Sequence, residues 1–258
     1  MRTILIIILL AALALSGCDP NTNGNHNQNG NANRAATYKP PAPLTPKSAV
    51  DQNFVSCNPY FPLVPGSVAK YVLNYSSGLV ADATVVIDLE EQNGRKVFVE
   101  RTQIVDRSGG LQQVQNTVKQ YVCDGERIQI ISEKNETRVE ERQSINENNY
   151  RENTVVLVDP AALAQKGTTW TIGFTLTFQS PGEPLSTLPD AMYVTFTVVG
   201  SEELTIPTGK VKAVAVQRKV KENMSTDYYA RGLGLVKRIS TEGTTWELRE
   251  YSGLKPMD

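Results

Sequence analysis

The feature of this chain that most constrains its fold is an alternation of apolar and polar residues with a period of two. In the clearest stretch, residues 170–178, apolar side chains occupy every second position, with threonine or glycine between them. The same period recurs at residues 69–75, 85–89, 192–198 and 244–248. Because successive side chains of a strand point to opposite faces, this period is typical of antiparallel strands with one packed face and one face in water.

Turn-forming residue pairs lie between the alternating stretches. They are Ser77-Gly78, Asn93-Gly94, Asp124-Gly125 and Thr208-Gly209. Helix is scarce and is predicted only at residues 159–167, where Asp159 can cap a helix that begins at Pro160. We therefore predict an all-β, mainly antiparallel fold. It would be either a sandwich or a strongly curled half-barrel of about ten strands, with one short helix.

The N-terminus has the pattern of an export signal. Arg2 precedes an apolar run from Ile4 to Leu15, and the small residues Ser16 and Gly17 follow it. The run is too short to span a bilayer comfortably, so residues 1–17 are predicted to be a signal peptide. The alternative is a short N-terminal membrane anchor beside an incidental cysteine.

The stretch Leu15-Ser16-Gly17-Cys18 resembles the lipobox of bacterial lipoproteins. The resemblance implies that Cys18 receives diacylglycerol on its sulfur and that cleavage falls just before it. Two or more acyl chains make such an anchor durable. The protein would then be a lipid-anchored protein of the bacterial cell envelope outside the cytoplasm, periplasmic in a Gram-negative cell.

Residues 18–53 are predicted to be a disordered tether. Asparagine occupies alternate positions from Asn21 to Asn33, and prolines follow from Pro40 to Pro46. Such a composition cannot bury enough apolar surface to fold. The remaining residues, 54–258, are predicted to form a single antiparallel β domain.

Charge and histidine content exclude several classes of function. Lys and Arg number 26 against 27 Asp and Glu, so the chain lacks the basic excess expected of a nucleic-acid-binding protein. His26, the single histidine, lies in the predicted tether. A domain without histidine excludes Ser-His-Asp and Cys-His nucleophiles and histidine-based metal sites, so neither a metal nor another cofactor is predicted.

Cys57 and Cys123 remain after Cys18. An even pair in an oxidising compartment is more often bridged than free, so a disulfide is predicted, with two buried free thiols as the alternative.

Four stretches together resemble a group of uncharacterised bacterial envelope lipoproteins. The first, Tyr60–Tyr71, is similar to that group's opening motif "yFPL" followed by glycine, and the last, Tyr228–Lys237, to its "YyApGvGlVk" motif. Between them, Gly167–Trp170 and Ile206–Val214 match a "G-x-x-W" and a "vPaGtf" hairpin. The resemblance implies an antiparallel β domain of unknown biochemical role.

Carboxylates are the main candidates left for catalysis. Adjacent pairs occur at Glu90-Glu91, Glu140-Glu141 and Glu202-Glu203. Neighbours on a strand point to opposite faces, so these pairs are interpreted as solvated and no catalytic residue is assigned. We expect a non-catalytic binding or structural lipoprotein with an envelope protein, glycan or lipid as its partner. The alternatives are a carboxylate-dependent glycan hydrolase and a carrier of lipids or lipoproteins with an apolar concave sheet.

Overall fold

The structure, a computed structural model, describes residues 41–106, 113–139, 142–180 and 182–257. Cys18, the predicted signal peptide, most of the predicted tether and the pair Glu140-Glu141 lie outside these residues. Residues 43–258 form one compact unit. No helix within the described residues is both long enough and apolar enough to cross a membrane.

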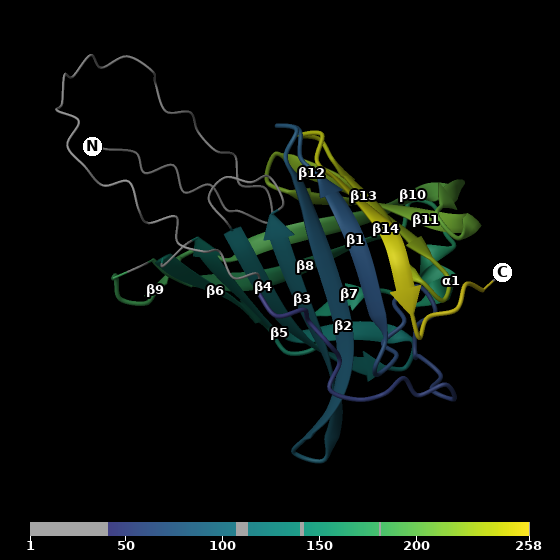
Figure 1. Cartoon of the computed structure of the whole chain (residues 1–258), viewed down its shortest axis with the longest axis horizontal. Coiled ribbons are helices and arrows are strands. Elements are labelled where there is room, and N and C mark those ends of the chain that lie inside the picture. The colour runs from purple at the N-terminus through teal and green to yellow at the C-terminus, as the bar shows by residue number, and fades with distance from the viewer. Residues whose placement is uncertain (1–40, 107–112, 140–141, 181, 258) are drawn as a thin grey trace, which may run out of the picture. The chain divides into compact units, whose positions relative to one another are not determined.

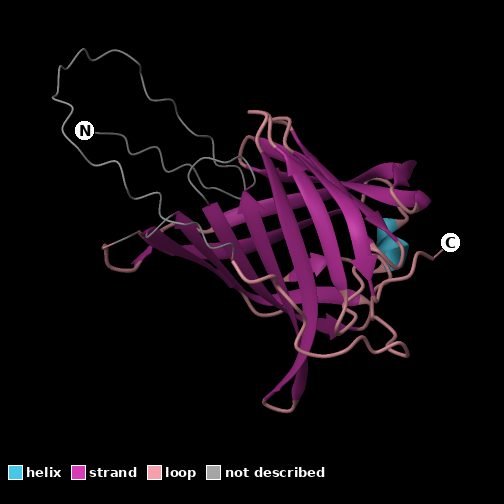
Figure 2. Cartoon of the chain, viewed as in Figure 1, coloured by secondary structure: helices cyan, strands magenta, loops and turns pink. Residues whose placement is uncertain are grey.

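The compact unit is built from one sheet of 14 strands and one short helix (Figures 1 and 2). The first seven strands are β1 (Val68–Asn74), β2 (Val80–Gln92), β3 (Arg95–Asp106), β4 (Gln113–Asp124), β5 (Arg127–Val139), β6 (Arg142–Tyr150) and β7 (Val155–Leu157). After helix α1 (Pro160–Leu163) come β8 (Thr169–Gln179), β9 (Ser186–Thr187), β10 (Met192–Ile206), β11 (Gly209–Val220), β12 (Asn223–Ala230), β13 (Gly234–Ser240) and β14 (Thr245–Ser252).

The sheet closes on itself as an up-and-down barrel. Apart from β7 and β9, each strand pairs antiparallel with the next along the chain, and β1 pairs with β14 to complete a ring of twelve strands. β7 is attached to β5, and β9 is attached to β8. Figure 1 shows β1 between β14 and β2 on the near wall.

The predicted all-β, antiparallel architecture is correct, but the sandwich or half-barrel of about ten strands is wrong. A sandwich has two sheets with free edges, whereas pairing of β1 with β14 leaves the twelve-strand ring without an edge. The extra strands come from the polar region around β5 and β6, where the apolar alternation is absent.

Local sequence accounts for the turns and the helix. The turn between β2 and β3 is made by Asn93 and Gly94 with φ of 53° and 73°, the left-handed values that a tight hairpin needs. The predicted helix is present but covers only four residues, and the Asp159 side chain accepts the Ala162 N–H at 2.9 Å.

Residues directly opposite each other in neighbouring strands share a face of the sheet, so the ladders tell which side chains point into the barrel. Tyr71 on β1 is opposite Ala83 on β2 and Leu248 on β14, and all three are buried on the inward face. The residues between them, such as Lys70, point outward.

The segment of residues 43–53, which we call the N-terminal strap, lies along the outer face of β2 and β3. Asp88 accepts the backbone N–H of Lys47 at 2.7 Å and two hydrogen bonds from Arg101, at 2.8 and 2.6 Å. Arg101 also donates to the carbonyl of Thr45 at 2.8 Å. The second half of the predicted tether is therefore bonded to the barrel.

Residues 54–63, which we call the end segment, cross one end of the barrel. The Asn58 side chain donates to the carbonyls of Glu126, at the β4–β5 turn, and of Val158. The Pro59 carbonyl accepts the N–H of Gly232, in the β12–β13 turn, at 2.6 Å. The disulfide between Cys57 and Cys123, with an S–S distance of 2.06 Å, fixes the same segment to β4.

Candidate functional site

A layer of charged side chains lies in the interior of the barrel. We call the following six residues the charged layer: Glu100 on β3, Lys119 on β4, Glu133 on β5, Arg218 on β11, Asp227 on β12 and Arg238 on β13. Glu100 is opposite Lys119, and Lys119 is opposite Glu133, so all three share one face. On the other wall, Asp227 is opposite Arg238.

Charged side chains on the two walls interact with each other across the interior of the barrel. Burial raises the pKa of Glu100, and the positive charge of Arg238 opposes that rise. Burial lowers the pKa of Arg218, and the negative charge of Glu133 opposes that change. The strands that carry these partners are not neighbours in the sheet, so their side chains interact through the interior of the barrel.

Glu133 is held as a carboxylate by partners on three strands. It accepts a hydrogen bond from the Tyr150 hydroxyl at 2.6 Å and one from Asn135 at 3.4 Å, and the Lys119 Nζ lies 3.8 Å away. Burial raises the pKa of Glu133, but Lys119 and hydrogen bonds from Tyr150, Asn148 and Asn135 outweigh it and bring the value down to about 2.

Asp227 and Arg238 form the ion pair of the facing wall. Arg238 donates from Nε to Oδ1 at 2.5 Å and from Nη2 to Oδ2 at 2.7 Å. The Tyr229 hydroxyl donates to the same carboxylate at 3.3 Å, and the Arg238 guanidinium carbon lies 5.7 Å from the centre of the Trp246 ring. Burial raises the pKa of Asp227, but Arg238, Arg218 and Tyr229 together bring it below its ordinary value.

Two members of the charged layer have no such partner. Among the described residues, nothing forms a hydrogen bond or an ion pair within 4.0 Å with Arg218 or Glu100. The pKa of Arg218 is lowered by burial and by the positive charge of Arg238. The pKa of Glu100 is raised by burial and by the negative charge of Glu133. Lys119 and Arg238 oppose the change at Glu100, and Asp227 and Glu133 oppose it at Arg218, but these charges act without a direct ion pair.

Solvent reaches this layer even though its residues face inward. The side chain of Arg238 is 24% exposed and that of Lys119 is 31% exposed. Arg218 and Glu100 are also only partly buried. The interior therefore differs from a solid apolar core at this level, since polar groups contact water inside the ring of strands.

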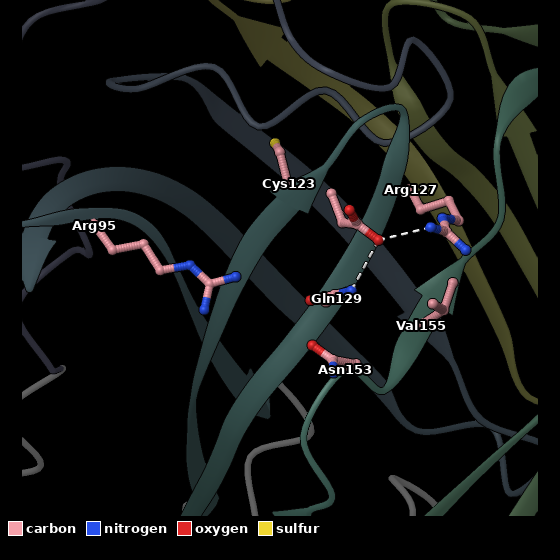
Figure 3. Close-up of a pocket in the computed structure, with 7 residues that line it drawn as sticks. Arg95, Cys123, Arg127, Gln129, Asn153 and Val155 are labelled. Carbon is pink, nitrogen blue, oxygen red and sulfur yellow. Dashed lines mark hydrogen bonds and ion pairs between the residues drawn. The ribbon is translucent and has the colours of Figure 1, made fainter.

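An outer pocket lies at the β4–β5 turn, close to the disulfide (Figure 3). It has a volume of about 480 Å³ and is lined by Arg95, Cys123, Asp124, Arg127, Gln129, Asn153 and Val155. Asp124 accepts hydrogen bonds from Arg127 at 2.8 Å and from Gln129 at 3.1 Å, drawn as dashed lines in Figure 3. Because these charges pair with each other in an open depression, the charged layer is the stronger candidate site.

The residues singled out in the sequence occupy mostly structural positions. Cys57 and Cys123 form the disulfide at the barrel end, and Cys123 lies on the same strand as Lys119 of the charged layer. Glu90 pairs with Lys47 of the strap at 2.7 Å, and Glu203 pairs with Lys210 at 2.7 Å on the surface. Among the described residues, no group of three or more His, Cys, Asp or Glu side chains could hold a metal ion.

Sequence reasoning missed every member of the charged layer. A signal is visible in hindsight around β5 and β6, where Glu133, Asn135, Asn146 and Asn148 occupy alternate positions. Polar residues with a period of two on an inward face indicate a polar interior. A strand's sequence does not tell which face points inward, so this alternation alone does not assign these polar residues to the interior.

No protein-family model matches the chain, and no curated protein matches it. Two solved structures are similar to it. One is a "putative exported protein with YmcC-like fold" from Bacteroides fragilis, with 12% identity and a TM-score of 0.43 over 72% of this chain and 95% of that one. The other is a "putative lipoprotein" from Parabacteroides distasonis, with 10% identity and a TM-score of 0.40 over 77% of this chain and 100% of that one.

Proposed function

We propose that this chain is a lipid-anchored lipoprotein of the bacterial cell envelope and that its barrel is a non-catalytic module that binds a ligand in its interior. The anchor is proposed from the stretch Leu15–Cys18. The single observation that supports binding is the charged layer, in which inward-facing charges are accessible to solvent and two of them form no ion pair with any residue that the structure describes.

The anchor is tested by metabolic labelling with palmitate and by fractionation of the envelope. The Cys18→Ser variant is expected to lose the label and to leave the membrane fraction, since the acylated sulfur is gone. Ser16→Ala keeps a small residue before the cleavage site and serves as the matched control. Retention of label in Cys18→Ser would contradict the proposed anchor.

Binding is tested by native mass spectrometry of the full chain purified from envelope membranes in mild detergent. A bound compound adds a discrete mass to the native spectrum and disappears when the same sample is sprayed under denaturing conditions. The Lys219→Gln variant, altered on the outer face of β11, is expected to retain that mass. A native mass equal to that of the acylated polypeptide alone would contradict a ligand-binding barrel.

A glycan hydrolase is the second candidate, favoured by Glu100 and Glu133. Both carboxylates face the interior on either side of Lys119, which places them two strand spacings, roughly 10 Å, apart. Their pKa values move in opposite directions, as in acid and nucleophile pairs. A reducing-end assay on purified envelope glycans separates the candidates, because the binding module releases no new ends. Release that Glu100→Gln abolishes would favour the hydrolase.

The composition of the inward face limits which ligand a lipid carrier of this fold could hold. Aromatic and aliphatic side chains line much of the interior, including Phe174, Phe196 and Trp246. The charged layer interrupts this apolar lining. A ligand that fits both parts has an apolar portion and a charged group, rather than being a bare hydrocarbon chain.

A further inference from the structure

Arg218 stands out among the interior residues because no carboxylate among the described residues forms an ion pair with it. It lies on the inward face of β11, opposite Phe196 on β10 and Ser225 on β12. The nearest carboxylate along the ladder is Asp227, on the neighbouring strand. Asp227 already accepts two hydrogen bonds from Arg238 and one from Tyr229. Its oxygens are therefore committed.

Arg238, in the same interior, is a fully paired arginine and serves as a comparison for Arg218. It has a bidentate carboxylate at 2.5 and 2.7 Å and the face of Trp246 at 5.7 Å. Arg218 has neither kind of partner among the described residues. An unpaired guanidinium in a protein interior costs stability, so a purely structural residue at this position would be expected to be apolar or paired.

The surroundings of Arg218 are suited to a ligand that has one flat apolar part. Phe196 stacks on Trp170 with ring centres 5.1 Å apart and planes 9° from parallel. Phe196 is the cross-strand neighbour of Arg218, and Trp170 is the next residue along the same row, so an aromatic pair borders the position of Arg218. The hydroxyl of Ser225, on the other side of Arg218, forms no hydrogen bond with another described residue and is partly exposed.

The pairing within the charged layer, rather than its charge count, indicates the charge of the ligand. The layer has three basic and three acidic members, so its formal charge is balanced. Asp227 and Glu133 act on Arg218 through their charges, but within the described part of the chain neither forms an ion pair with it. A guanidinium fork matches a carboxylate with two parallel hydrogen bonds. A second negative charge on the ligand would find no second unpaired cation among the described members of the layer, because Arg238 pairs with Asp227 and the Lys119 Nζ lies 3.8 Å from Glu133.

We propose that Arg218 binds the carboxylate of a singly charged organic acid whose apolar part packs against Phe196 and Trp170. This inference rests on the proposed function, because it names the ligand class of the same barrel interior. It makes Arg218 a binding residue whose presence lowers the stability of the unliganded protein.

The test is calorimetric titration of the full chain with three matched probes: 2-naphthoate, its neutral amide 2-naphthamide, and 2-naphthyl phosphate. The wild type is expected to bind 2-naphthoate at least tenfold more tightly than either of the others. Arg218→Gln is expected to weaken binding of 2-naphthoate at least tenfold, Arg218→Lys to retain part of it, and Lys219→Gln, on the outer face of the same strand, to leave it unchanged.

Thermal unfolding supplies a readout that a structural arginine would not give. Arg218→Gln is expected to melt at a higher temperature than the wild type without ligand, and 2-naphthoate is expected to raise the midpoint of the wild type only. A lowered midpoint in Arg218→Gln, equal affinity of that variant for 2-naphthoate, or tighter binding of the amide or the phosphate would overturn the assignment. If native mass spectrometry finds a bound compound while the probes fail, the ligand class is wrong and the binding function stands.

Discussion

Arg238 donates two hydrogen bonds to Asp227 from the neighbouring strand, with Nε 2.5 Å from Oδ1 and Nη2 2.7 Å from Oδ2. The Asp227 side chain is only 2% exposed, whereas that of Arg238 is 24% exposed. The carboxylate is thus the buried member of the pair, and it also orients Tyr229. The pair ties β12 to β13 on the inside of the barrel.

Removal of this carboxylate is expected to destabilise the fold. Asp227→Asn leaves Arg238 without a counter-ion, which lowers the free energy of unfolding by about 3 kcal/mol. Urea denaturation measures the loss. The matched control is Glu250→Gln, which breaks the exposed cross-strand pair with Lys70 and costs at most about 1 kcal/mol. Equal effects of the two changes would contradict the assigned role of Asp227.

Glu100 and Glu133 are expected to respond in opposite ways to neutralisation at pH 7. The pKa of Glu133 is lowered to about 2, so the folded state favours its charged form, and Glu133→Gln lowers the free energy of unfolding. The pKa of Glu100 is raised, so the folded state favours its neutral form, and Glu100→Gln raises the free energy of unfolding. The two variants are each other's control in urea denaturation.

The lowered pKa of Glu133 also predicts how stability depends on pH. The stabilisation by Glu133 is present above its unfolded pKa of about 4.5 and is lost as the pH falls toward 2. Urea midpoints measured from pH 7 to pH 2 should therefore fall less steeply in Glu133→Gln than in the wild type below pH 4.5. An unchanged slope in that variant would show that Glu133 does not carry the acid sensitivity.

The disulfide is expected to contribute strongly to stability because it closes a long loop. Cys57 and Cys123 are 66 residues apart, for which the chain-entropy model gives about 4 kcal/mol. Dithiothreitol should lower the urea midpoint of the wild type and leave that of the Cys57→Ser/Cys123→Ser variant unchanged. A wild type that is insensitive to the reductant would favour the two free thiols.

Gly232 is expected to tolerate no side chain. Its φ is +76°, and a Cβ there would lie 1.8 Å from the carbonyl oxygen of Lys255. Gly232→Ala should therefore cost about 3 kcal/mol in urea denaturation, through clash as well as backbone strain. Gly78→Ala is the control, since its φ is +83° with nothing within 4 Å of the added Cβ. Its cost should be about 1 kcal/mol.

Local sequence predicts the strands whose apolar residues alternate, their turns and the cap of α1, because each depends on residues within one turn or one strand. Local sequence does not predict the closure of the barrel. The contact that closes the ring joins Lys70 to Glu250, which are 180 residues apart, and an alternating pattern is the same in an open and a closed sheet.

The charged layer could not be predicted from the sequence either. Its members come from six strands, and only the register of the closed ring brings Arg238 near Glu100. Hydrophobic periodicity predicts which face of a strand is apolar, and it therefore fails where the inward face is polar, as around Glu133.

The position of the disulfide determines how the barrel would bear a mechanical load. Tension applied to the chain before the N-terminal strap first loads the hydrogen bonds of the strap to β2 and β3. Once these bonds release, the tension passes through the disulfide to Cys123 and bypasses the loop between the cysteines, which contains β1, β2 and β3. The seam between β1 and β14, where the ring closes, then lies outside the path of the force. Reduction of the bond would route the same pull through β1, and the barrel would open at that seam first.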